Sequence, residues 1–216
     1  MPIHVIVADD HTIVRNGLAS LLESVDEIVV VGEAADGRQA VHEAQRLRPD
    51  VVVMDIAMPE LNGIEATQQI CESLSTTRVV ILSVYSTLDH ISLALKAGAK
   101  GYLLKGSAAK EVAEAIRTVH AGHYYLSREI TDAVVKDYAG ERKDSASENP
   151  MSMLTSRERE ILQMVVEGKS NSEMAEILGL APTSAAIYRS RLMKKLGTKD
   201  LPSLVKLAIH HGLTVL

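Results

Sequence analysis

The sequence predicts an α/β domain with a five-stranded, parallel, doubly wound sheet, joined to an all-α domain of four helices. Three observations lead to this prediction. Runs of Val and Ile alternate with segments of helical spacing along the first 105 residues, which is typical of a parallel sheet with helices on both faces. Residues 151–216 contain helical patterns alone. The charge also changes sign, because residues 1–150 hold 14 Lys and Arg against 22 Asp and Glu, and residues 151–216 hold 9 against 6.

The expected strands of the first domain are five short apolar runs of strand length. They cover residues 3–8, 28–32, 51–54, 79–83 and 101–104. Between them, apolar side chains recur three or four residues apart, as in Val14, Leu18 and Leu22, which predicts amphipathic helices. A turn is expected at Asn-Gly 62–63, and a last helix at about residues 108–120.

Composition excludes several classes of protein. The 216 residues include one cysteine, Cys71, so no disulfide can form within the chain, which suits a reducing compartment. The N-terminus lacks the basic start and apolar stretch of a signal peptide, and no apolar run approaches the ~18 residues of a membrane span. We therefore expect a cytoplasmic protein with no membrane partner. Without Trp or Phe, its core must be aliphatic.

A connecting segment is expected between the two domains. The predicted boundaries are 1–122 for the first domain, 123–150 for the connection and 151–216 for the second domain. Within the connection, residues 123–138 can form one more helix after a cap at Ser127. Residues 139–150 are polar and contain Gly, Ser and Pro, which is typical of a flexible tether.

The second domain carries capping signals for four helices. Thr155 followed three residues later by Glu158 predicts a capping box, and Gly179 suits the end of the second helix. The third helix, expected at 182–196, is basic. Two short helices followed by a basic one favour DNA binding by a helix-turn-helix. The less favoured alternative is a small helical bundle with a solvated basic face.

Polar side chains stand where the expected strands of the first domain end. Asp9 and Asp10 follow the first strand, Asp55 ends the third, Ser83 ends the fourth and Lys105 follows the fifth. The carboxyl ends of parallel strands form one edge of the sheet, where such folds build their sites. Carboxylates this close repel unless a cation neutralises them, and oxygen ligands select a hard ion such as Mg²⁺. The charge of Lys105 and the hydroxyl of Ser83 complete a set that suits a phosphoryl group.

Each of these residues has a simpler interpretation when it is taken alone. Asp9 and Asp10 could cap the helix that follows them, and Asp55 could be a turn residue. Ser83 and Lys105 carry no information by themselves. The ordered set, with each member at a strand end, is what indicates a site.

Four stretches carry a resemblance to a known family: VADDHTIVRNGL, VVVMDIAMPELNG, VVILSVYS and AGAKGYLLK. Together they resemble the receiver domain of bacterial response regulators across about residues 1–122, which implies a flavodoxin-like fold. The resemblance implies that Asp55 is the phosphoacceptor and that a partner sensor histidine kinase is the donor. It implies that Mg²⁺ is arranged by Asp9, Asp10, Asp55 and the backbone carbonyl of Ala57.

The same resemblance assigns roles in switching. It implies that Lys105 contacts the phosphoryl group, that Ser83 closes onto it, and that Tyr102 swings inward when Ser83 moves. Hydrolysis of the phosphorylated form is expected to be slow for two reasons. Ala57 has no group to orient a water, and Tyr85 is large enough to obstruct one.

The second domain resembles another family. The stretches LTSREREILQMVVEGKSNSEMAEILGL and MKKLG…LVKLAIHHGL resemble the LuxR-type DNA-binding domain, so the whole chain resembles a response regulator of the NarL/FixJ type. This implies that Glu158 helps to hold the helices together, that helix 182–196 enters the major groove of double-stranded DNA, and that activation promotes a homodimer. The candidate DNA contacts, mostly to phosphates, are Thr183, Ser184, Tyr188, Arg189, Arg191, Lys194 and Lys195.

The start of the expected recognition helix departs from the family pattern. Ala181 stands where the family has a Ser or Thr cap, and Ala185, Ala186 and Ile187 lack groups that read base edges. Tyr188 could contact a phosphate or pack in the core. The departure weakens the expected base-specific recognition and leaves the fold unchanged.

We therefore expect a two-domain transcriptional regulator that is switched by phosphorylation of Asp55 and is not a turnover enzyme. The alternative is a receiver-based protein-interaction adaptor with weakened DNA recognition. A third interpretation, a metal-dependent phosphohydrolase, is disfavoured because Ala57 stands where such an enzyme places a second acid. The stretch GEAADGRQ has the spacing of a phosphate-binding loop, but Arg38 and Gln39 replace its Lys and Ser or Thr.

Overall fold

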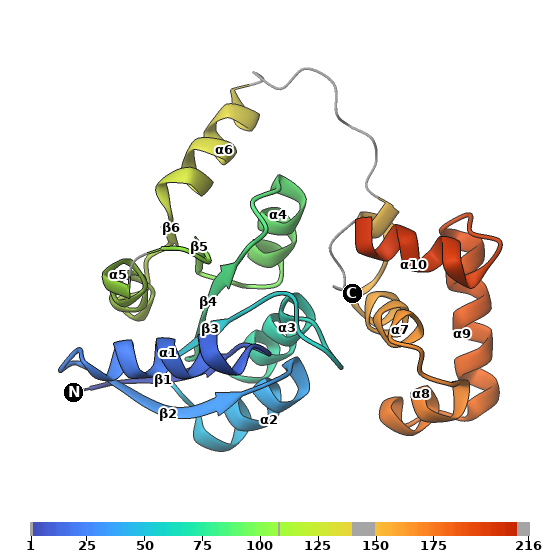
Figure 1. Ribbon diagram of the computed structural model, residues 1–216, viewed down its shortest axis with the longest axis horizontal. Coiled ribbons are helices and arrows are strands. Elements are labelled where there is room, and N and C mark those ends of the chain that lie inside the picture. The colour runs from blue at the N-terminus through green and yellow to red at the C-terminus, as the bar shows by residue number, and fades with distance from the viewer. Residues whose placement is uncertain (1, 108, 140–149, 211–216) are drawn as a thin grey trace. The chain divides into compact units, whose positions relative to one another are not determined.

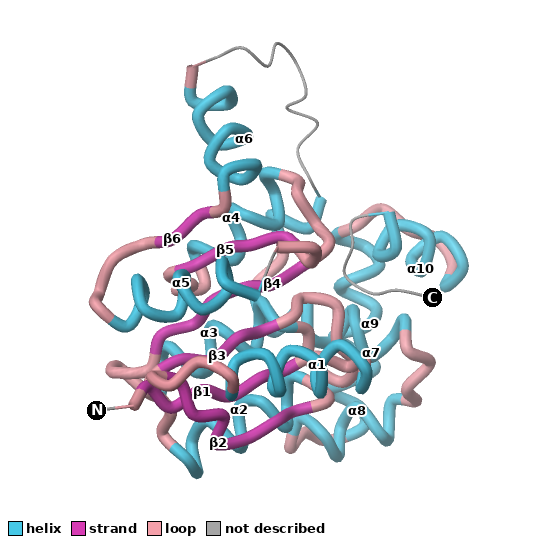
Figure 2. Tube along the Cα trace, turned by 60° about the vertical axis from the view of Figure 1, so that its left-hand side comes forward, coloured by secondary structure: helices cyan, strands magenta, loops and turns pink. Residues whose placement is uncertain are grey.

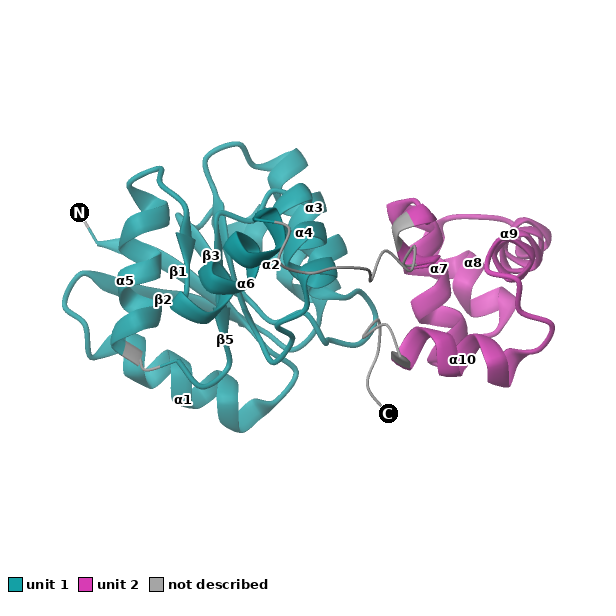
Figure 3. Ribbon diagram, turned by 90° about the horizontal axis from the view of Figure 1, so that it is seen from above, with its two compact units in different colours: residues 1–145 teal, residues 146–216 magenta. Residues whose placement is uncertain are grey.

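The computed structural model describes residues 2–107, 109–139 and 150–210. The chain divides into two compact units, residues 1–145 and 146–216, and each is described here by itself (Figure 1, Figure 3). The expected tether at 139–150 lies almost wholly outside the described residues. Among the helices that are described, none has the length and apolar character needed to cross a membrane.

The first unit is built on one parallel sheet in the order β2-β1-β3-β4-β5-β6 (Figure 2). The strands are β1 (Ile3–Ala8), β2 (Ile28–Ala34), β3 (Val51–Met54), β4 (Arg78–Ser83), β5 (Gly101–Leu104) and β6 (Tyr125–Leu126). The chain crosses from β1 outward to β2 and then back to β3 on the other side, which is the flavodoxin-like, doubly wound order. The predicted α/β fold is confirmed.

The sequence predicts five strands, and the described sheet has six. The sixth, β6, is two residues long and pairs with the beginning of β5 at the edge of the sheet. Two residues are too few to show the alternation by which a strand is recognised. The helix expected from residue 123 therefore begins later, at Arg128, and Ser127 stands at its N-cap as predicted.

Helices cover both faces of the sheet. They are α1 (Thr12–Glu23), α2 (Gly37–Leu47), α3 (Gly63–Ser73), α4 (Leu88–Lys96), α5 (Ala109–His120) and α6 (Arg128–Tyr138). Leu22 of α1 and Ile116 of α5 share one apolar core, and α2, α3, α4 and α6 contribute to the other. Ile130 of α6 is fully buried there, so the helix expected in the connecting segment packs on the first unit.

The strand β3 explains the unbroken apolar run before Asp55. Val51 and Val53 lie in the core under α1 and α5, whereas Val52 and Met54 lie in the opposite core. Successive side chains of a strand point to opposite faces, and both faces are covered, so every residue of β3 is buried. Asp55 is the residue at which the chain leaves this core.

The second unit is helical, as predicted. It contains a short 3-10 helix, η1 (Pro150–Met153), and the helices α7 (Ser156–Val166), α8 (Asn171–Leu178), α9 (Pro182–Lys195) and α10 (Leu201–His210). The predicted capping box of Thr155 and Glu158 is present at the start of α7, and Gly179 ends α8 with a left-handed φ of 64°. Leu162, Leu192 and Leu204 join three of these helices in one small core.

Candidate functional site

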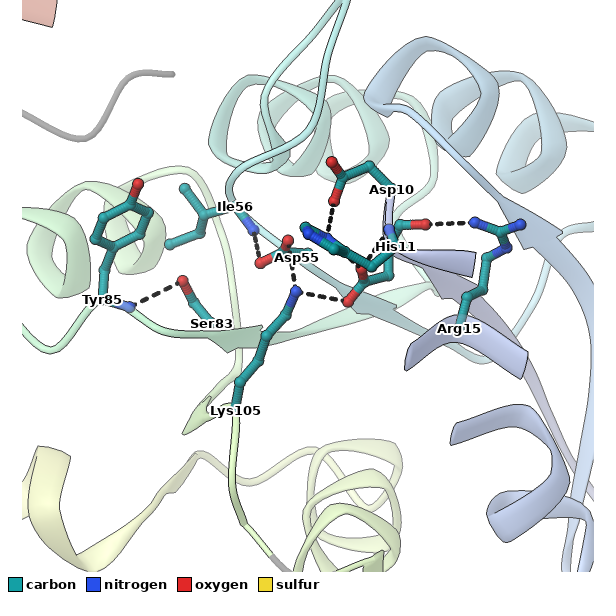
Figure 4. Close-up of polar contacts among 9 residues, drawn as sticks. Asp10, His11, Arg15, Asp55, Ile56, Ser83, Tyr85 and Lys105 are labelled. Atoms are coloured by element: carbon teal, nitrogen blue, oxygen red, sulfur yellow. Dashed lines mark hydrogen bonds and ion pairs between the residues drawn. The ribbon is translucent and has the colours of Figure 1, made fainter. Parts of the chain in front are cut away.

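The fold brings the predicted site residues of the first unit to one edge of the sheet. Asp9 follows β1, Asp55 follows β3, Ser83 ends β4 and Lys105 follows β5. Figure 4 shows the side chain of Lys105 reaching toward Asp55. Its Nζ lies 2.7 Å from Oδ2 of Asp9 and 2.8 Å from Oδ2 of Asp55. Both aspartates are 3% exposed, so one ammonium group neutralises part of a buried pair of carboxyl groups.

Burial and ion pairing act in opposite directions at this pair. Burial raises the pKa of Asp55 and outweighs the lowering that comes from Lys105 and from the backbone N–H of Ile56, which donates to Oδ1 over 2.8 Å. For Lys105, burial lowers the pKa, but its hydrogen bonds to Asp55 and Asp9 outweigh that effect and leave the pKa raised. Lys105 therefore stays charged, and burial makes the carboxylate form of Asp55 less favourable than it is in water.

The charge at this edge fits a divalent cation. Asp10 is half-buried beside Asp9, so this edge holds three carboxyl groups and the ammonium group of Lys105, which pairs with Asp9 and Asp55. When all three carboxyl groups are ionised, the ammonium group balances one negative charge, and the four groups together carry a net charge of −2. Ligand atoms of Asp9, Asp10 and His11 lie within 4.8 Å of one another, and oxygens dominate this set. Such donors suit a hard ion of charge +2.

The loop after β3 holds the backbone of Asp55 against α3. Asn62 is the N-cap of this helix, and its Oδ1 accepts from the N–H groups of Ile64 and Glu65. A Cβ on Gly63 would lie 1.8 Å from the carbonyl oxygen of Asp55. The Asn-Gly pair, which the sequence predicts as a turn, is therefore also a place of close backbone approach that admits only glycine. Ala57, the expected carbonyl ligand, is buried in the same loop.

Ser83 and Tyr102 are linked through a third residue, Tyr85. The backbone N–H of Tyr85 donates to Oγ of Ser83 over 3.2 Å, and the hydroxyl of Tyr102 donates to the carbonyl oxygen of Tyr85 over 2.8 Å. Tyr102 is fully buried, and burial raises the pKa of its phenol well above the ordinary value. Tyr102 therefore lies inward in this structure, and its movement with Ser83 stays a prediction.

The basic helix α9 separates its residues between the core and the surface. Ala185 and Leu192 are buried, and Tyr188 packs against the core, which matches the second of the two interpretations of that side chain. The exposed residues of α9 are Pro182, Thr183, Ile187, Ser190, Arg191, Lys194 and Lys195. Of the other candidate DNA contacts, Ser184 and Arg189 are half-buried. The exposed face is thus basic in its second half and lacks long polar side chains in its first.

Two sequence families match the chain. The response regulator receiver domain matches residues 5–117, and the luxR family of bacterial regulatory proteins matches residues 152–208. Similar proteins include the transcriptional regulatory protein MctR of Rhizobium johnstonii, which is 38% identical over 98% of this chain and 95% of its own. The response regulator UvrY of Escherichia coli is 37% identical over the same shares.

Solved structures agree with these matches. The response regulator ChrA of a heme-sensing two-component system is 32% identical, covers 98% of both chains and has a TM-score of 0.54. A two-component response regulator of the LuxR family from Aurantimonas sp. is 33% identical, covers 64% of this chain and 99% of its own, and has a TM-score of 0.62. The chain belongs to the response regulators of the NarL/FixJ type.

In this response regulator, the predicted role of Glu158 has a clear structural basis. Its carboxylate accepts from Nζ of Lys195 over 2.7 Å, which joins α7 to α9, and it also completes the capping box with Thr155. Burial raises the pKa of Glu158, but the hydrogen bonds from Lys195 and Thr155 outweigh it, so the pKa is lowered overall. Lys195, a candidate DNA contact, thus has a partner within the protein.

Some residues of the response regulator's receiver site are not apparent from the sequence. Arg15 donates from Nη1 to the carbonyl oxygen of Asp9 over 2.7 Å and from Nε to Glu33 over 3.0 Å. Nδ1 of His11 lies 2.6 Å from Oδ1 of Asp10. His11 follows the two aspartates directly in the sequence, so its place in the site could have been predicted. The contact of Arg15 with the backbone of Asp9 depends on the tertiary fold and could not.

Proposed function

We propose that this response regulator is switched by phosphorylation of Asp55 by a partner sensor histidine kinase, and that the phosphorylated form binds double-stranded DNA through α9. One observation carries the proposal: Lys105 joins two buried aspartates, Asp9 and Asp55, at the carboxyl edge of a parallel sheet. In a response regulator, Asp55 is well placed to accept a phosphoryl group, because the fixed charge of Lys105 beside it can neutralise the phosphoryl oxygens.

The proposed chemistry is a transfer between two nucleophiles. A carboxylate oxygen of Asp55 forms a bond to phosphorus while the bond from phosphorus to the donor's imidazole nitrogen breaks, and the released imidazole takes up a proton from solvent. Lys105 then contacts a phosphoryl oxygen, and the hydroxyl of Ser83 donates to another. This role for Ser83 requires its hydroxyl to turn away from its present surroundings at Tyr85.

The proposed cofactor is Mg²⁺, held by Asp9, Asp10 and Asp55 with the backbone carbonyl of Ala57. When bound, the ion supplies charge neutralisation for the phosphoryl oxygens. The two negative charges left by three carboxyl groups and Lys105 support this assignment. His11 belongs to the same cluster, but its nitrogen is a softer donor than Mg²⁺ prefers, so we assign it to holding Asp10.

DNA binding is assigned to the exposed side of α9. Arg191 and Lys194 lie on this surface, and they suit contacts to phosphates, which position a protein on DNA. We further propose that the receiver covers residues 1–122 functionally, with 123–150 connecting it to a DNA-binding domain at 151–216. Phosphorylation would free that domain and promote a homodimer, in the cytoplasm.

The adaptor remains the second candidate function. Its support is the first half of α9, where Ala185 is buried, Ala186 is half-buried and Ile187 is exposed. None of these side chains offers a hydrogen bond to a base edge. Binding that is weak and equal for every DNA sequence would favour the adaptor.

The test of the phosphoacceptor is incorporation of phosphate from acetyl phosphate in the presence of Mg²⁺. The wild-type chain should take up one phosphoryl group, and Asp55→Asn should take up none. Asp26→Asn is the matched control, because Asp26 is exposed in the turn after α1. Undiminished labelling of Asp55→Asn would overturn the assignment.

A further inference from the structure

The ring of Tyr85 is held in place by a histidine of the next helix. The two rings of Tyr85 and His90 are stacked, with 4.4 Å between their centroids and 6° between their planes. The backbone of Tyr85 is fixed as well, because its carbonyl oxygen accepts from the hydroxyl of Tyr102. Both the backbone and the side chain of Tyr85 therefore have defined partners.

His90 is itself anchored. It is the third residue of α4 and is 9% exposed, and its Nδ1 lies 2.6 Å from Oγ1 of Thr87. This contact fixes the orientation of the imidazole ring, and stacking on that ring then orients the ring of Tyr85. An exposed tyrosine that lacked such a neighbour would exchange between staggered rotamers.

Tyr85 lies on the same side of Asp55 as Ser83, two residues beyond Ser83 in the sequence. Figure 4 shows Tyr85 and Ser83 on one side of Asp55, with Asp10 and His11 on the other. Burial raises the pKa of the Tyr85 phenol, and the charge of Asp55 raises it further. The second effect requires the phenol to lie within electrostatic reach of the acceptor.

We propose that His90 is a positioning residue that fixes the Tyr85 ring beside Asp55 and thereby prolongs the phosphorylated state. This rests on the proposed phosphorylation of Asp55. In hydrolysis, a water oxygen forms a bond to phosphorus, the bond from phosphorus to the Asp55 oxygen breaks, and the water loses one proton to solvent. The attacking water must stand in line with the breaking bond. A ring that is fixed near this line excludes water more completely than a ring that changes rotamer.

The first experiment measures loss of phosphate from the full chain after loading with acetyl phosphate and removal of the excess. His90→Ala should lose phosphate about three to ten times faster than wild type, a range that matches the strength of one stacked aromatic pair. His90→Phe keeps a stacking ring and should restore a nearly wild-type rate. His42→Ala, which changes an exposed histidine of α2, is the matched control and should leave the rate unchanged.

A double-mutant cycle tests whether His90 acts through Tyr85. Tyr85→Ala should also accelerate hydrolysis, and the double variant Tyr85→Ala/His90→Ala should be no faster than Tyr85→Ala alone. Equal acceleration by His90→Ala in the presence and absence of Tyr85 would overturn the proposal. So would an unchanged rate in His90→Ala, or slower hydrolysis in Tyr85→Ala, which would mean that the phenol orients the water.

The position of the ring has a readout that does not depend on phosphorylation. The chain has six tyrosines and neither Phe nor Trp, so the aromatic NMR signals of Tyr85 can be resolved. His90→Ala should move these signals toward those of an unstacked, mobile ring and leave the signals of Tyr124 unchanged. Unmoved Tyr85 signals would contradict the positioning role. If wild-type Asp55 takes up no phosphate at all, the proposed function fails, whereas this NMR result stands on its own.

Discussion

At the scale of single residues, the site depends on the carboxyl group of Asp55, whose burial makes its charged form unfavourable. The proposed attack on phosphorus requires Asp55 to be a carboxylate, yet burial favours its neutral form and raises its pKa. The folded pKa therefore lies above that of the unfolded chain, which is near the ordinary 3.8. A carboxyl group with a raised folded pKa reduces stability increasingly as the pH rises from the unfolded pKa to the folded pKa. The cost is complete above the folded pKa and disappears as the pH falls below both values.

Asp55→Asn should therefore raise the free energy of unfolding at about pH 7, because the amide removes a buried charge and still accepts from Lys105. The gain over wild type should shrink as the pH is lowered toward the unfolded pKa, since wild-type Asp55 then becomes neutral. Urea unfolding at several pH values, with a chelator to remove divalent ions, measures both quantities. A gain that grows on acidification would mean that the pKa of Asp55 is lowered.

Gly63 is the second residue on which the site depends. Gly63→Ala should destabilise the first unit by more than about 3 kcal/mol, in the upper tail of point mutations, because its Cβ would meet the carbonyl oxygen of Asp55 at 1.8 Å. Gly17→Ala is the matched control. A Cβ on Gly17, in α1, has no atom within 4 Å, so alanine should stabilise that helix by up to about 1 kcal/mol. Equal thermal unfolding of the two variants would refute this account of Gly63.

At the scale of elements, α9 combines structural residues with the proposed DNA contacts, one helical turn apart. Lys195 pairs with Glu158 of α7, while Arg191 is exposed on the same helix. Lys195→Ala should lower the stability of the second unit by roughly 0.5–1 kcal/mol and weaken DNA binding only slightly. Arg191→Ala should leave stability unchanged and weaken binding to specific and scrambled DNA alike.

Thermal unfolding and DNA titration of the two variants separate these roles. If Arg191→Ala weakens binding to one DNA sequence alone, Arg191 reads a base. If Lys195→Ala weakens DNA binding more than Arg191→Ala does, then the pair with Glu158 opens on DNA.

The parts of the fold and of the site that follow a simple sequence pattern could be predicted from the sequence. Asp9, Asp55 and Lys105 could be brought together from the sequence because strand ends of a parallel sheet share one edge. The capping box at Thr155 follows from two residues three apart. The strand β6 could not be predicted because it is too short to show a period. Glu158 could be assigned to holding the helices together, but its partner Lys195 is 37 residues away, and only packing brings α9 to α7.

At the scale of the whole molecule, the chain joins an acidic receiver to a basic DNA-binding unit. We expect three or four phosphate contacts per monomer if Lys195 keeps its internal partner. They would come from the half-buried Arg189, the exposed Arg191 and Lys194, and the exposed Lys199 just after α9. The logarithm of DNA affinity should then fall with the logarithm of salt concentration with a slope of roughly −3 per monomer. Titrations at several salt concentrations measure this slope, and a value near zero would mean that α9 does not lie on DNA.

The central claim is that phosphorylation of Asp55 controls DNA binding, and its most direct test is DNA affinity with and without acetyl phosphate. The wild-type chain should bind a genomic target about 5 to 150 times more tightly after phosphorylation, the usual range for coupling between two sites. Asp55→Asn should show no such gain, and Asp26→Asn should show all of it. Equal affinity of the phosphorylated and unphosphorylated wild-type chains would contradict the claim and leave the adaptor as the better explanation.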